Sequence, residues 1–230
     1  MACLVDRYLF PSCDVFLNLG GIANISYVKN GIWQAYDFGV CNQFFNKLAH
    51  FKGKAYDDRG KIAASGEVIP ALAEKIMTFP FFEKDPPKSL DNTFIRETLW
   101  PVIDQHDGRI EDKMATCVAI LTQSFCRSLL DIRLAEQKSN NPKLFQSIMI
   151  SGGGAKNTFL VNSLLREGQK ILGLDQYKID ESLADMKEAM LMSLAGAFRI
   201  LELPNFMASA SGASQSTSGG AIYLPQILKK

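Results

Sequence analysis

Alternation of apolar and other residues near the start of the chain predicts three β-strands. These strands span residues 14–19, 22–28 and 32–38. In the first of them Val15, Leu17 and Leu19 would share one face, because successive side chains of a strand point to opposite sides. A glycine pair at 20–21 and the Asn-Gly pair at 30–31, a frequent hairpin turn, separate the strands. The pattern therefore predicts an antiparallel meander.

Apolar residues at helical spacing account for most of the remaining chain. The predicted helices span residues 42–51, 67–79, 93–103, 112–136, 157–166 and 187–201. The longest has an apolar stripe at spacings of three and four, formed by Cys117, Leu121, Phe125, Leu129 and Ile132. In the last helix the residues predicted to be buried are Ala189, Met192, Ala195 and Phe198. Two more strands are predicted at 145–150 and 177–179.

Capping and turn residues set the expected ends of these elements. Asn42 has a side chain that can cap the helix it begins. Pro101 is expected to end its helix near Leu99, because proline lacks the N–H that a helix interior needs. The polar stretch 53–65 and the Ser/Gly/Ala-rich tail 208–220 are predicted to be loops. The whole order, three strands followed by helices interleaved with two strands, indicates a mixed α/β sheet covered by helices.

The composition is that of an ordinary globular protein. Hydrophobic residues make up 47% of the 230 residues, and the formal net charge is +1. Basic residues are spread along the chain, which argues against a nucleic-acid-binding surface. No apolar run reaches the ~18 residues of a membrane span, and Asp6 and Arg7 argue against a signal peptide. Five cysteines without a C-x-x-C pair and two histidines give no zinc pattern and favour reduced thiols in the cytoplasm.

The most informative stretch is residues 148–157, where a short apolar run leads into three glycines and then a predicted helix. Gly152, Gly153 and Gly154 are costly in backbone entropy, so they indicate a positive φ or a backbone that lies close against a partner. One interpretation is the wall of a nucleotide site, with the amides of the following helix near the phosphates. The other is a tight strand-to-helix turn of any α/β protein. This segment alone leaves both interpretations open.

Other motifs offer candidate binding residues, each with a plainer alternative. The Gly20-Gly21 turn, with Asn24 just after it, can surround an anion with backbone amides or can be a simple hairpin. Asp37, at a strand end, can hold a hydrated Mg²⁺ or can cap a turn. Lys88 can face a substrate or only solvent. Glu188, near the start of the last predicted helix, can face a nucleotide or can simply stabilise the helix N-terminus.

Six short motifs follow one another along the chain. They are Asn-Leu-Gly-Gly-Ile-Ala-Asn-Ile from Asn18, Asp-Phe-Gly-x-x-Asn from Asp37, Tyr-Asp-Asp-x-Gly from Tyr56, Pro-Pro-Lys-Ser from Pro86, Ser-Gly-Gly-Gly-Ala-x-Asn from Ser151 and Lys-Glu-Ala from Lys187. Together with the tail segment Ala208–Ala213, this ordered set closely resembles the anhydro-N-acetylmuramic acid kinase family. The resemblance runs from about residue 7 to residue 224. Each motif alone is weak, whereas their order and spacing are specific.

The resemblance implies a fold and an activity. The fold is an α/β lobe of the actin-like ATPase (ribonuclease H-like) type, a mixed five-stranded sheet with helices on both faces and a helical insertion at about 53–110. Residues 1–230 would form a single C-terminal ATPase lobe, because the motifs match only the C-terminal half of such a kinase. In that family ATP, with Mg²⁺, phosphorylates 1,6-anhydro-N-acetylmuramic acid while water opens its anhydro ring, during recycling of cell-wall sugars.

The resemblance also implies site residues. The phosphates of ATP would lie at Gly20, Gly21 and Asn24. The adenosine would lie along Gly152, Gly153, Gly154 and Asn157. The floor of the cleft would be lined by Asp37, Gly39 and Asn42, with Glu188 facing the nucleotide. Lys88 and Ser89 would face the sugar, and Asp37 would reach Mg²⁺ through water.

Several parts of the family pattern are absent or changed. The first lobe of the family opens with a Gly-Thr-Met-Ser-Gly-Thr-Ser-like phosphate loop, and the aspartate that acts as general base lies just before the point that matches the start of this chain. Neither is found here, and Asp6 matches a non-catalytic position. In the family's usual Asp-Thr-Gly-Pro-Gly-Asn, Phe38 replaces the hydroxyl and Cys41 the second glycine. Thr93 stands where a substrate-facing glutamate is usual.

These observations leave two functional hypotheses. The first is the ATP-binding lobe of an anhydro-N-acetylmuramic acid kinase-like sugar kinase that is inactive without the missing lobe. The second is a non-catalytic nucleotide-binding or scaffolding protein that kept the fold, which the departures at Phe38, Val40 and Thr93 favour. Under either hypothesis ATP is the expected ligand. A lobe without its neighbour would expose apolar surface, which predicts self-association into a homo-oligomer or a partner chain.

Overall fold

A five-stranded sheet forms the centre of the molecule. The computed structural model describes residues 2–29, 31–138, 145–179 and 181–223, with the backbone alone at 2, 3, 7, 9, 181–185, 188 and 211. The strands are β1 Val15–Leu19, β2 Ile22–Lys29, β3 Ile32–Val40, β4 Ser147–Ser151 and β5 Gln176–Ile179. Their order across the sheet is β3-β2-β1-β4-β5. β1, β2 and β3 form the predicted antiparallel meander, and β4 and β5 run parallel to β1.

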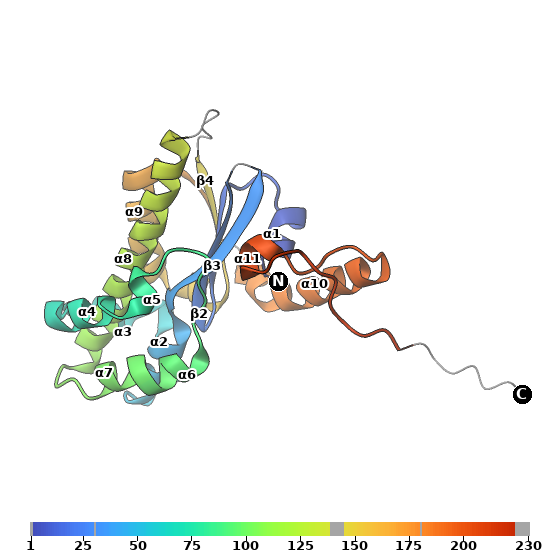
Figure 1. The fold of residues 1–230 in the computed structure, drawn as a ribbon. Helices are drawn as coiled ribbons and strands as arrows, with labels where there is room; N and C mark the ends of the chain where they lie inside the picture. The colour runs from blue at the N-terminus through green and yellow to red at the C-terminus, as the bar shows by residue number, and fades with distance from the viewer. Residues whose placement is uncertain (1, 30, 139–144, 180, 224–230) are drawn as a thin grey trace, which may run out of the picture.

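Helices cover both faces of this sheet (Figure 1). One face carries α2 Asn42–His50, α8 Ile110–Gln137 and α9 Thr158–Leu172. The other face carries α1 Ala2–Leu9 and α10 Glu181–Ile200, with the short α11 Ala208–Ser211 beside β3. The prediction of a mixed five-stranded sheet with helices on both faces is therefore confirmed. The layout is the one expected for a lobe of the actin-like ATPase fold.

The main core lies between the sheet and α8. Val15, Leu17 and Leu19 have no exposed surface, as their alternation predicts. The apolar stripe of α8 is also buried along its whole length, at Cys117, Leu121, Phe125, Leu129 and Ile132. Burial of a large apolar side chain contributes about 1.5–3 kcal/mol, so this contact between helix and sheet dominates the stability of the fold.

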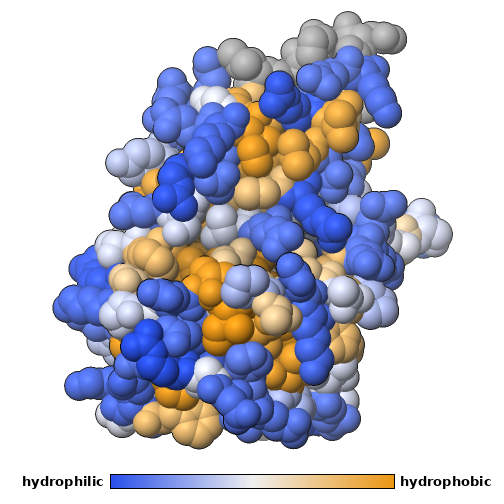
Figure 2. Space-filling view, turned by 90° about the vertical axis from the view of Figure 1, so that its left-hand side faces the viewer, coloured by the Kyte–Doolittle hydropathy of each residue, from blue (hydrophilic) through white to orange (hydrophobic). Residues whose placement is uncertain are grey.

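Short helices fill the chain between α2 and α8. They are η1 Asp58–Gly60, α3 Lys61–Ala64, α4 Pro70–Met77, α5 Pro80–Glu83, α6 Asn92–Phe94, the π-helical η2 Ile95–Leu99 and α7 Trp100–Asp104. The prediction that 53–65 is only a loop is therefore wrong. The buried carboxylate of Asp57 accepts hydrogen bonds from the backbone N–H of Ile62 (2.8 Å) and Ala63 (3.1 Å), which holds the start of α3. Figure 2 shows the outer face of this helical side, where apolar side chains gather in two places among hydrophilic ones.

The expected helix break at Pro101 does not occur. The chain stays helical from α6 through η2 to α7, and Pro101 lies in the first turn of α7. The five-residue π-helical turn immediately before it changes the hydrogen-bond register, so that the missing N–H of proline falls where no regular bond is required. Asn42 is also not the cap of α2: Cys41 holds that position, and no side chain caps the helix.

The helices on the other face depart most from the sequence pattern. α1 was not predicted, α10 begins six residues earlier than its predicted start at 187, and α11 lies in the predicted tail loop. Ala195 is buried as predicted, whereas Ala189 and Met192 are exposed. The ring of Phe198 packs edge-on against Tyr8 at 5.0 Å. Because no helix of the described part of the chain covers the outer side of α10, a smaller part of its surface is buried than the apolar pattern suggests.

A buried ion pair attaches α1 and α10 to the sheet. Lys187 Nζ lies 2.7 Å from Asp6 Oδ1, with side chains only 10% and 4% exposed. Asp6 Oδ2 also accepts a hydrogen bond from Ser26 Oγ at 3.0 Å, and Lys187 donates to Ser151 Oγ at 3.1 Å. The four side chains therefore join both helices to β2 and β4. Because each charge has hydrogen-bond partners in addition to the other, the pair offsets the cost of its burial.

A sharp turn leads from β4 into the one-turn 3₁₀-helix η3 Gly153–Lys156. Gly152 has φ 86° and ψ 166°, a region open essentially to glycine alone. A Cβ on Gly152 would lie 2.8 Å from the backbone carbonyl of Leu19 and 2.8 Å from Asn18 Oδ1. Both the backbone angle and the space therefore require glycine here.

Two further features are the state of the cysteine thiols and the hydropathy of the helices. The described cysteines Cys13, Cys41, Cys117 and Cys126 are free, and burial raises the pKa of Cys41 and of Cys117 to about 12. Among the residues that the structure describes, no helix has the length and apolar character needed to cross a membrane.

Replacing Lys187 with methionine should strongly destabilise the protein. Lys187→Met leaves the Asp6 carboxylate buried without its cation, and such a change costs about 3–5 kcal/mol in the free energy of unfolding. Lys170→Met is the matched control, because Lys170 pairs with Glu167 at the surface and such pairs contribute about 0–1 kcal/mol. Urea denaturation measures the free energy of unfolding of both variants. Equal losses in the two variants would contradict the account, as would failure of the double variant Asp6→Asn/Lys187→Met to recover stability.

Alanine should be tolerated far less at Gly152 than at Gly173. Gly173 has φ 71° with nothing within 4 Å of an added Cβ, so Gly173→Ala carries only the left-handed backbone cost of about 1–2 kcal/mol. Gly152→Ala adds collisions with Leu19 and Asn18 to a strain of about 1–3 kcal/mol. Denaturant unfolding should rank Gly152→Ala clearly below Gly173→Ala. Equal midpoints would show that the turn relaxes and does not need this glycine.

Candidate functional site

Two glycine turns meet at the C-terminal end of β1. A Cβ on Gly154 would lie 2.7 Å from Leu19 Cβ and 2.9 Å from Leu19 O, so the backbone of η3 packs directly on the last residue of β1. The next residues form the Gly20-Gly21 turn into β2. The carbonyl of Gly20 accepts from Asn42 N at 3.1 Å, and that of Gly21 from Cys41 N at 3.0 Å. Both turns and the start of α2 therefore form one continuous surface.

Asn42 lies between the two turns. Its Nδ2 donates to the carbonyl of Leu19 at 3.2 Å. The same nitrogen lies 3.4 Å from the position of a Cβ on Gly153. This position explains why the side chain does not cap α2: it faces back toward β1. These contacts bring Gly20, Gly21, Asn42 and Gly153 into one region of the molecule.

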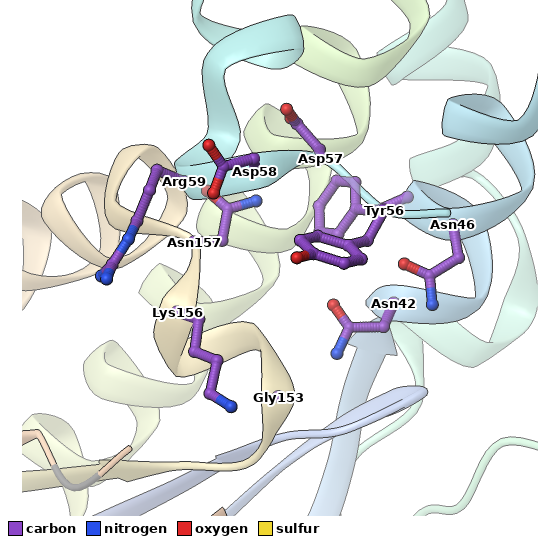
Figure 3. Close-up of a pocket in the computed structure, with 10 residues that line it drawn as sticks. Asn42, Asn46, Tyr56, Asp57, Asp58, Arg59, Gly153, Lys156 and Asn157 are labelled. Carbon is purple, nitrogen blue, oxygen red and sulfur yellow. The ribbon is translucent and has the colours of Figure 1, made fainter. Parts of the chain in front are cut away.

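A cavity of about 450 Å³ opens beside this junction. We call it the Gly153 pocket. It is lined by residues of α2, of the loop that leads into η1, and of the η3–α9 connection: Asn42, Phe45, Asn46, Tyr56, Asp57, Asp58, Arg59, Gly153, Lys156 and Asn157. Its size falls within the range of small-molecule sites. Figure 3 shows Tyr56 directed into the pocket, between Asn42 and Asn46 on one side and the loop of Asp57 and Asp58 on the other.

Local contacts hold the outer wall of the Gly153 pocket in place. Gly60 has φ 76°, and a side chain there would collide with Asn157 and Phe159. Thr158 Oγ1 donates to the carbonyl of Arg59 at 2.8 Å. Asn157 is buried and caps α9, because its Oδ1 accepts from Leu160 N at 3.0 Å. The motif from Tyr56 to Gly60 is therefore pinned to the start of α9.

The acidic side chains around the Gly153 pocket have partners within the chain. Lys61 Nζ pairs with Asp58 at 2.6 Å and holds the pKa of that carboxyl below its usual range. The carboxylate of Asp57 is occupied by backbone amides of α3. Lys156 and Arg59 extend toward the same side of the pocket (Figure 3). A planar, partly apolar ligand with an anionic end fits this combination of aromatic ring, amides and basic side chains.

A row of polar side chains crosses the sheet on the face that α1 and α10 cover, opposite the face that packs on α8. Ser151 on β4, Asn18 on β1, Asn24 on β2 and Asp37 on β3 are successive register partners, so their side chains point to the same side. We call these residues the polar row. It adjoins both glycine turns, since Asn18 Nδ2 lies 3.8 Å from a Cβ position on Gly20 and Asn18 Oδ1 lies 2.8 Å from that on Gly152.

Asp37 ends the polar row and holds the segment after α5. Its Oδ2 accepts from Ser89 Oγ and from Leu90 N, both at 2.9 Å, and its own N–H donates to Lys88 O at 3.1 Å. Asp37 therefore stabilises the fold by holding residues 88–90 against β3. Within the described residues no three His, Cys, Asp or Glu side chains gather as a metal site. A single carboxylate still fits Mg²⁺ that is held mainly by water and phosphate.

Two other predicted residues, Gly39 and Lys88, do not line the Gly153 pocket. Gly39 faces α8, where a Cβ would lie 2.6 Å from Leu121 Cδ1, so packing in the core explains its lack of a side chain. Lys88 donates to the carbonyl of Phe81 at 3.3 Å and lines a different cavity. Glu188 belongs to α10, but its side chain lies outside the described part of the structure.

Several residues of the Gly153 pocket were not identified from sequence as site residues: Phe45, Asn46, Tyr56, Arg59 and Lys156. The Tyr-Asp-Asp-x-Gly motif, which contains Tyr56 and Arg59, was the available signal. The motif contributes to the family resemblance, but no site role was predicted for its residues, because nothing local indicates that this loop packs on α9. Phe45 and Asn46 follow Asn42 on one helix and carry no motif of their own.

Comparison with known proteins gives a consistent assignment. The model of the anhydro-N-acetylmuramic acid kinase family matches residues 8–225. Anhydro-N-acetylmuramic acid kinases of Nitrosospira multiformis and Roseobacter denitrificans are each 30% identical, over 213 and 221 residues. The enzyme of Aliivibrio fischeri is 30% identical over 217 residues. These alignments cover 91%, 91% and 92% of this chain but 55%, 54% and 56% of the relatives. The chain thus spans about half the length of the curated relatives it matches.

Solved structures give more distant matches. Component A of the (R)-2-hydroxyglutaryl-CoA dehydratase of Acidaminococcus fermentans matches with a TM-score of 0.43 and 16% identity, over 82% of this chain and 63% of that one. The activator of the 2-hydroxyisocaproyl-CoA dehydratase of Clostridium difficile matches with a TM-score of 0.42 and 14% identity, over 87% and 66%. The family match, in contrast, extends over nearly the whole sequence and includes every motif of the site. The chain therefore belongs to the anhydro-N-acetylmuramic acid kinase family.

Proposed function

We propose that this chain is the ATP-binding lobe of an anhydro-N-acetylmuramic acid kinase-like sugar kinase. The observation that carries the proposal is the junction at Leu19. There the Gly20-Gly21 turn and the backbone of Gly153 and Gly154 pack around one strand end, beside a cavity of about 450 Å³. Turns of this kind present backbone amides to an anion at close range. Phosphoryl transfer to the anhydro sugar would require the complementary lobe, which would bring the general base.

The adenosine of ATP would occupy the Gly153 pocket. The ring of Tyr56 offers a stacking surface for a purine, and such stacking contributes about 1–3 kcal/mol. The amides of Asn42 and Asn46 can donate to and accept from base or ribose groups. The backbone of Gly153 would lie against the ligand without a side chain in between. Lys156 and Arg59 add positive charge on the side from which the phosphates would extend.

The phosphates would lie over the Gly20-Gly21 turn, next to the polar row. Asn24 and Asp37 belong to this row, and Ser89 is bonded to Asp37. In this proposal Asp37 acts on Mg²⁺ through a bound water, and the ion neutralises charge on the phosphates. Ser89, with the backbone near Lys88, would face the sugar. The side chain of Lys88 itself lines a different cavity.

A non-catalytic nucleotide-binding or scaffolding role is the second candidate. Phe38, at the position of the family's usual threonine, is fully buried and packs on Phe125 at 5.8 Å. It therefore offers no hydroxyl to a ligand. Thr93 uses its backbone N–H to complete the Asp91 cap of α6 at 2.7 Å and has no carboxylate with which to replace the usual glutamate. Both departures remove groups on the sugar side and leave the Gly153 pocket intact.

An apolar surface on the α10 side supports a partner for this lobe. A groove of about 470 Å³ runs between α10 and residues 205–222, and we call it the α10 groove. Met192, Ile200 and Ile222 line it and are 58%, 73% and 50% exposed. Such patches usually mark an interface. We propose that the part of the family chain that this chain does not span covers the α10 groove, and that copies of this chain associate when that part is absent.

Mg-ATP should bind to the isolated chain, and Tyr56→Ala should weaken binding about 5- to 150-fold, the equivalent of about 1–3 kcal/mol of lost stacking. Tyr177→Ala is the matched control, because Tyr177 is 62% exposed on β5 and does not line the pocket. Isothermal titration calorimetry measures the Mg-ATP affinity of the unaltered chain and of the two variants. Absence of binding at millimolar Mg-ATP would refute both functional candidates, and equal affinity in Tyr56→Ala would refute this position of the base.

The isolated chain should show no kinase turnover, because positioning of both substrates between two lobes supplies about 7–11 kcal/mol of the lowering of the barrier. A coupled ADP-release assay with Mg-ATP and the anhydro sugar tests this. Robust turnover would contradict the need for a second lobe. If Mg-ATP binds but addition of the complementary lobe restores no turnover, the scaffolding candidate gains support.

Concentration-dependent association should occur through the α10 groove. Sedimentation velocity over micromolar concentrations should show a rising weight-average coefficient, and Ile200→Lys should suppress the rise. Leu134→Lys is the control, since Leu134 is similarly exposed (53%) but lies on α8. A strictly monomeric profile, or equal suppression by both variants, would overturn the proposed surface.

A further inference from the structure

A second cavity lies on the helical side of the sheet, apart from the Gly153 pocket. It has a volume of about 220 Å³ and lies between β3, the segment after α5 and the middle of α8. We call it the Tyr36 pocket. The lining residues that matter here are Tyr36, Asp85, Lys88, Arg127, Ser128 and Asp131. None of its lining residues is shared with the Gly153 pocket.

The hydroxyl of Tyr36 is a buried donor that lacks a partner. The side chain is only 5% exposed, and its OH makes no hydrogen bond of acceptable distance and angle. Ser128 and Tyr27 are its neighbours, and the Ser128 hydroxyl donates to Ser124 O at 3.3 Å. Burial raises the pKa of Tyr36, so the group stays a neutral donor. Buried polar groups are nearly always satisfied, so an exception at a cavity wall marks a donor that a ligand acceptor could use.

Two cations face the same cavity without a carboxylate partner. Lys88 Nζ donates to Phe81 O at 3.3 Å and lies 5.0 Å above the Phe81 ring. Arg127 donates one N–H to Phe82 O at 2.8 Å. Neither forms an ion pair with any described residue. Burial and the neighbouring Arg127 lower the pKa of Lys88, and the carboxylates of Asp131 and Asp85 oppose this shift only in part.

Two carboxylates, those of Asp85 and Asp131, also line the Tyr36 pocket. Asp131 follows Arg127 by one helical turn, and Asp85 belongs to the segment after α5. Burial, together with Asp85, raises the pKa of Asp131. Neither carboxylate forms an ion pair among the described residues. The pocket therefore holds both signs of charge, on side chains of which Arg127, Asp85 and Asp131 are also exposed to solvent.

We propose that the Tyr36 pocket binds a small zwitterion of the α-amino acid class. Its carboxylate would accept from Tyr36, Lys88 and Arg127, and its ammonium group would donate to Asp131 and Asp85. The lining carries three basic and three acidic side chains, so a simple anion or cation would meet repulsion as well as attraction. The volume equals that of about seven water molecules, at roughly 30 Å³ each, which suits a small amino acid.

Occupancy of the Tyr36 pocket would reach the polar row through three consecutive residues. Lys88 lines the pocket, and its own carbonyl accepts from Asp37 N at 3.1 Å. The next two residues, Ser89 and Leu90, donate to the carboxylate of Asp37. A ligand that fixes Lys88 would therefore fix the segment that orients Asp37. The pocket is therefore a candidate effector site. Its ligand binding can be tested independently of the proposed kinase function.

Binding of defined amino acids to the whole chain tests the proposal without an activity assay. Glycine, both enantiomers of alanine and L-glutamate are compared with acetate and methylammonium by calorimetry and thermal unfolding. At least one amino acid should bind and raise the melting temperature, whereas the two singly charged probes should not. Arg127→Met and Asp131→Asn should each weaken that binding at least about tenfold, because each removes a charge-assisted hydrogen bond. Arg133→Met, an exposed change on the same helix, should leave it unaltered.

Tyr36→Phe keeps the shape of the pocket and guards against variants that fail to fold. It should leave the ligand-free protein as stable as before or more stable, because an unsatisfied hydroxyl is removed, and should weaken amino acid binding several-fold. The proposal is overturned if no amino acid binds at tens of millimolar. It is also overturned if acetate binds as well as the amino acids, or if Arg127→Met and Asp131→Asn bind like Arg133→Met.

Discussion

Close packing of glycine backbone on the end of β1 determines the architecture of the site. The backbone of Gly152 and Gly154 packs on Leu19, and the side-chain amide of Asn42 donates to the carbonyl of the same residue. No side chain larger than hydrogen fits at either glycine. This contact brings the loop after β4 against the turn after β1, although the two lie more than a hundred residues apart. The Gly153 pocket exists because these turns cannot separate.

The two faces of the sheet differ in polarity and in role. The face toward α8 is apolar and supplies most of the stability, through residues such as Leu17 and Phe125. The opposite face carries the polar row and the Asp6–Lys187 pair, which joins α1 and α10 to β2 and β4. The site thus lies where a rigid apolar layer meets a polar one. Backbone held from behind by a dense core is preorganised and needs little rearrangement to contact a ligand.

Sequence reasoning was most accurate where one local pattern decides the structure. The alternation of Val15, Leu17 and Leu19 and the stripe along α8 follow from the geometry of one element, and both are confirmed. It failed where distant partners decide. Asp6 and Lys187 are far apart in sequence, and Met192 has an apolar side chain whose exposure depends on a layer that is absent outside α10. Tyr56 was overlooked because only the fold brings its loop to Gly153.

The central claim is that two glycine turns contact one nucleotide. Amide NMR of the labelled chain during titration with Mg-ATP tests it most directly. The account predicts that the amides of Gly20, Gly21 and Gly153 shift together, with one saturation curve, while those of β5 stay unchanged. Shifts confined to one of the two turns, or separate curves for the two, would contradict it.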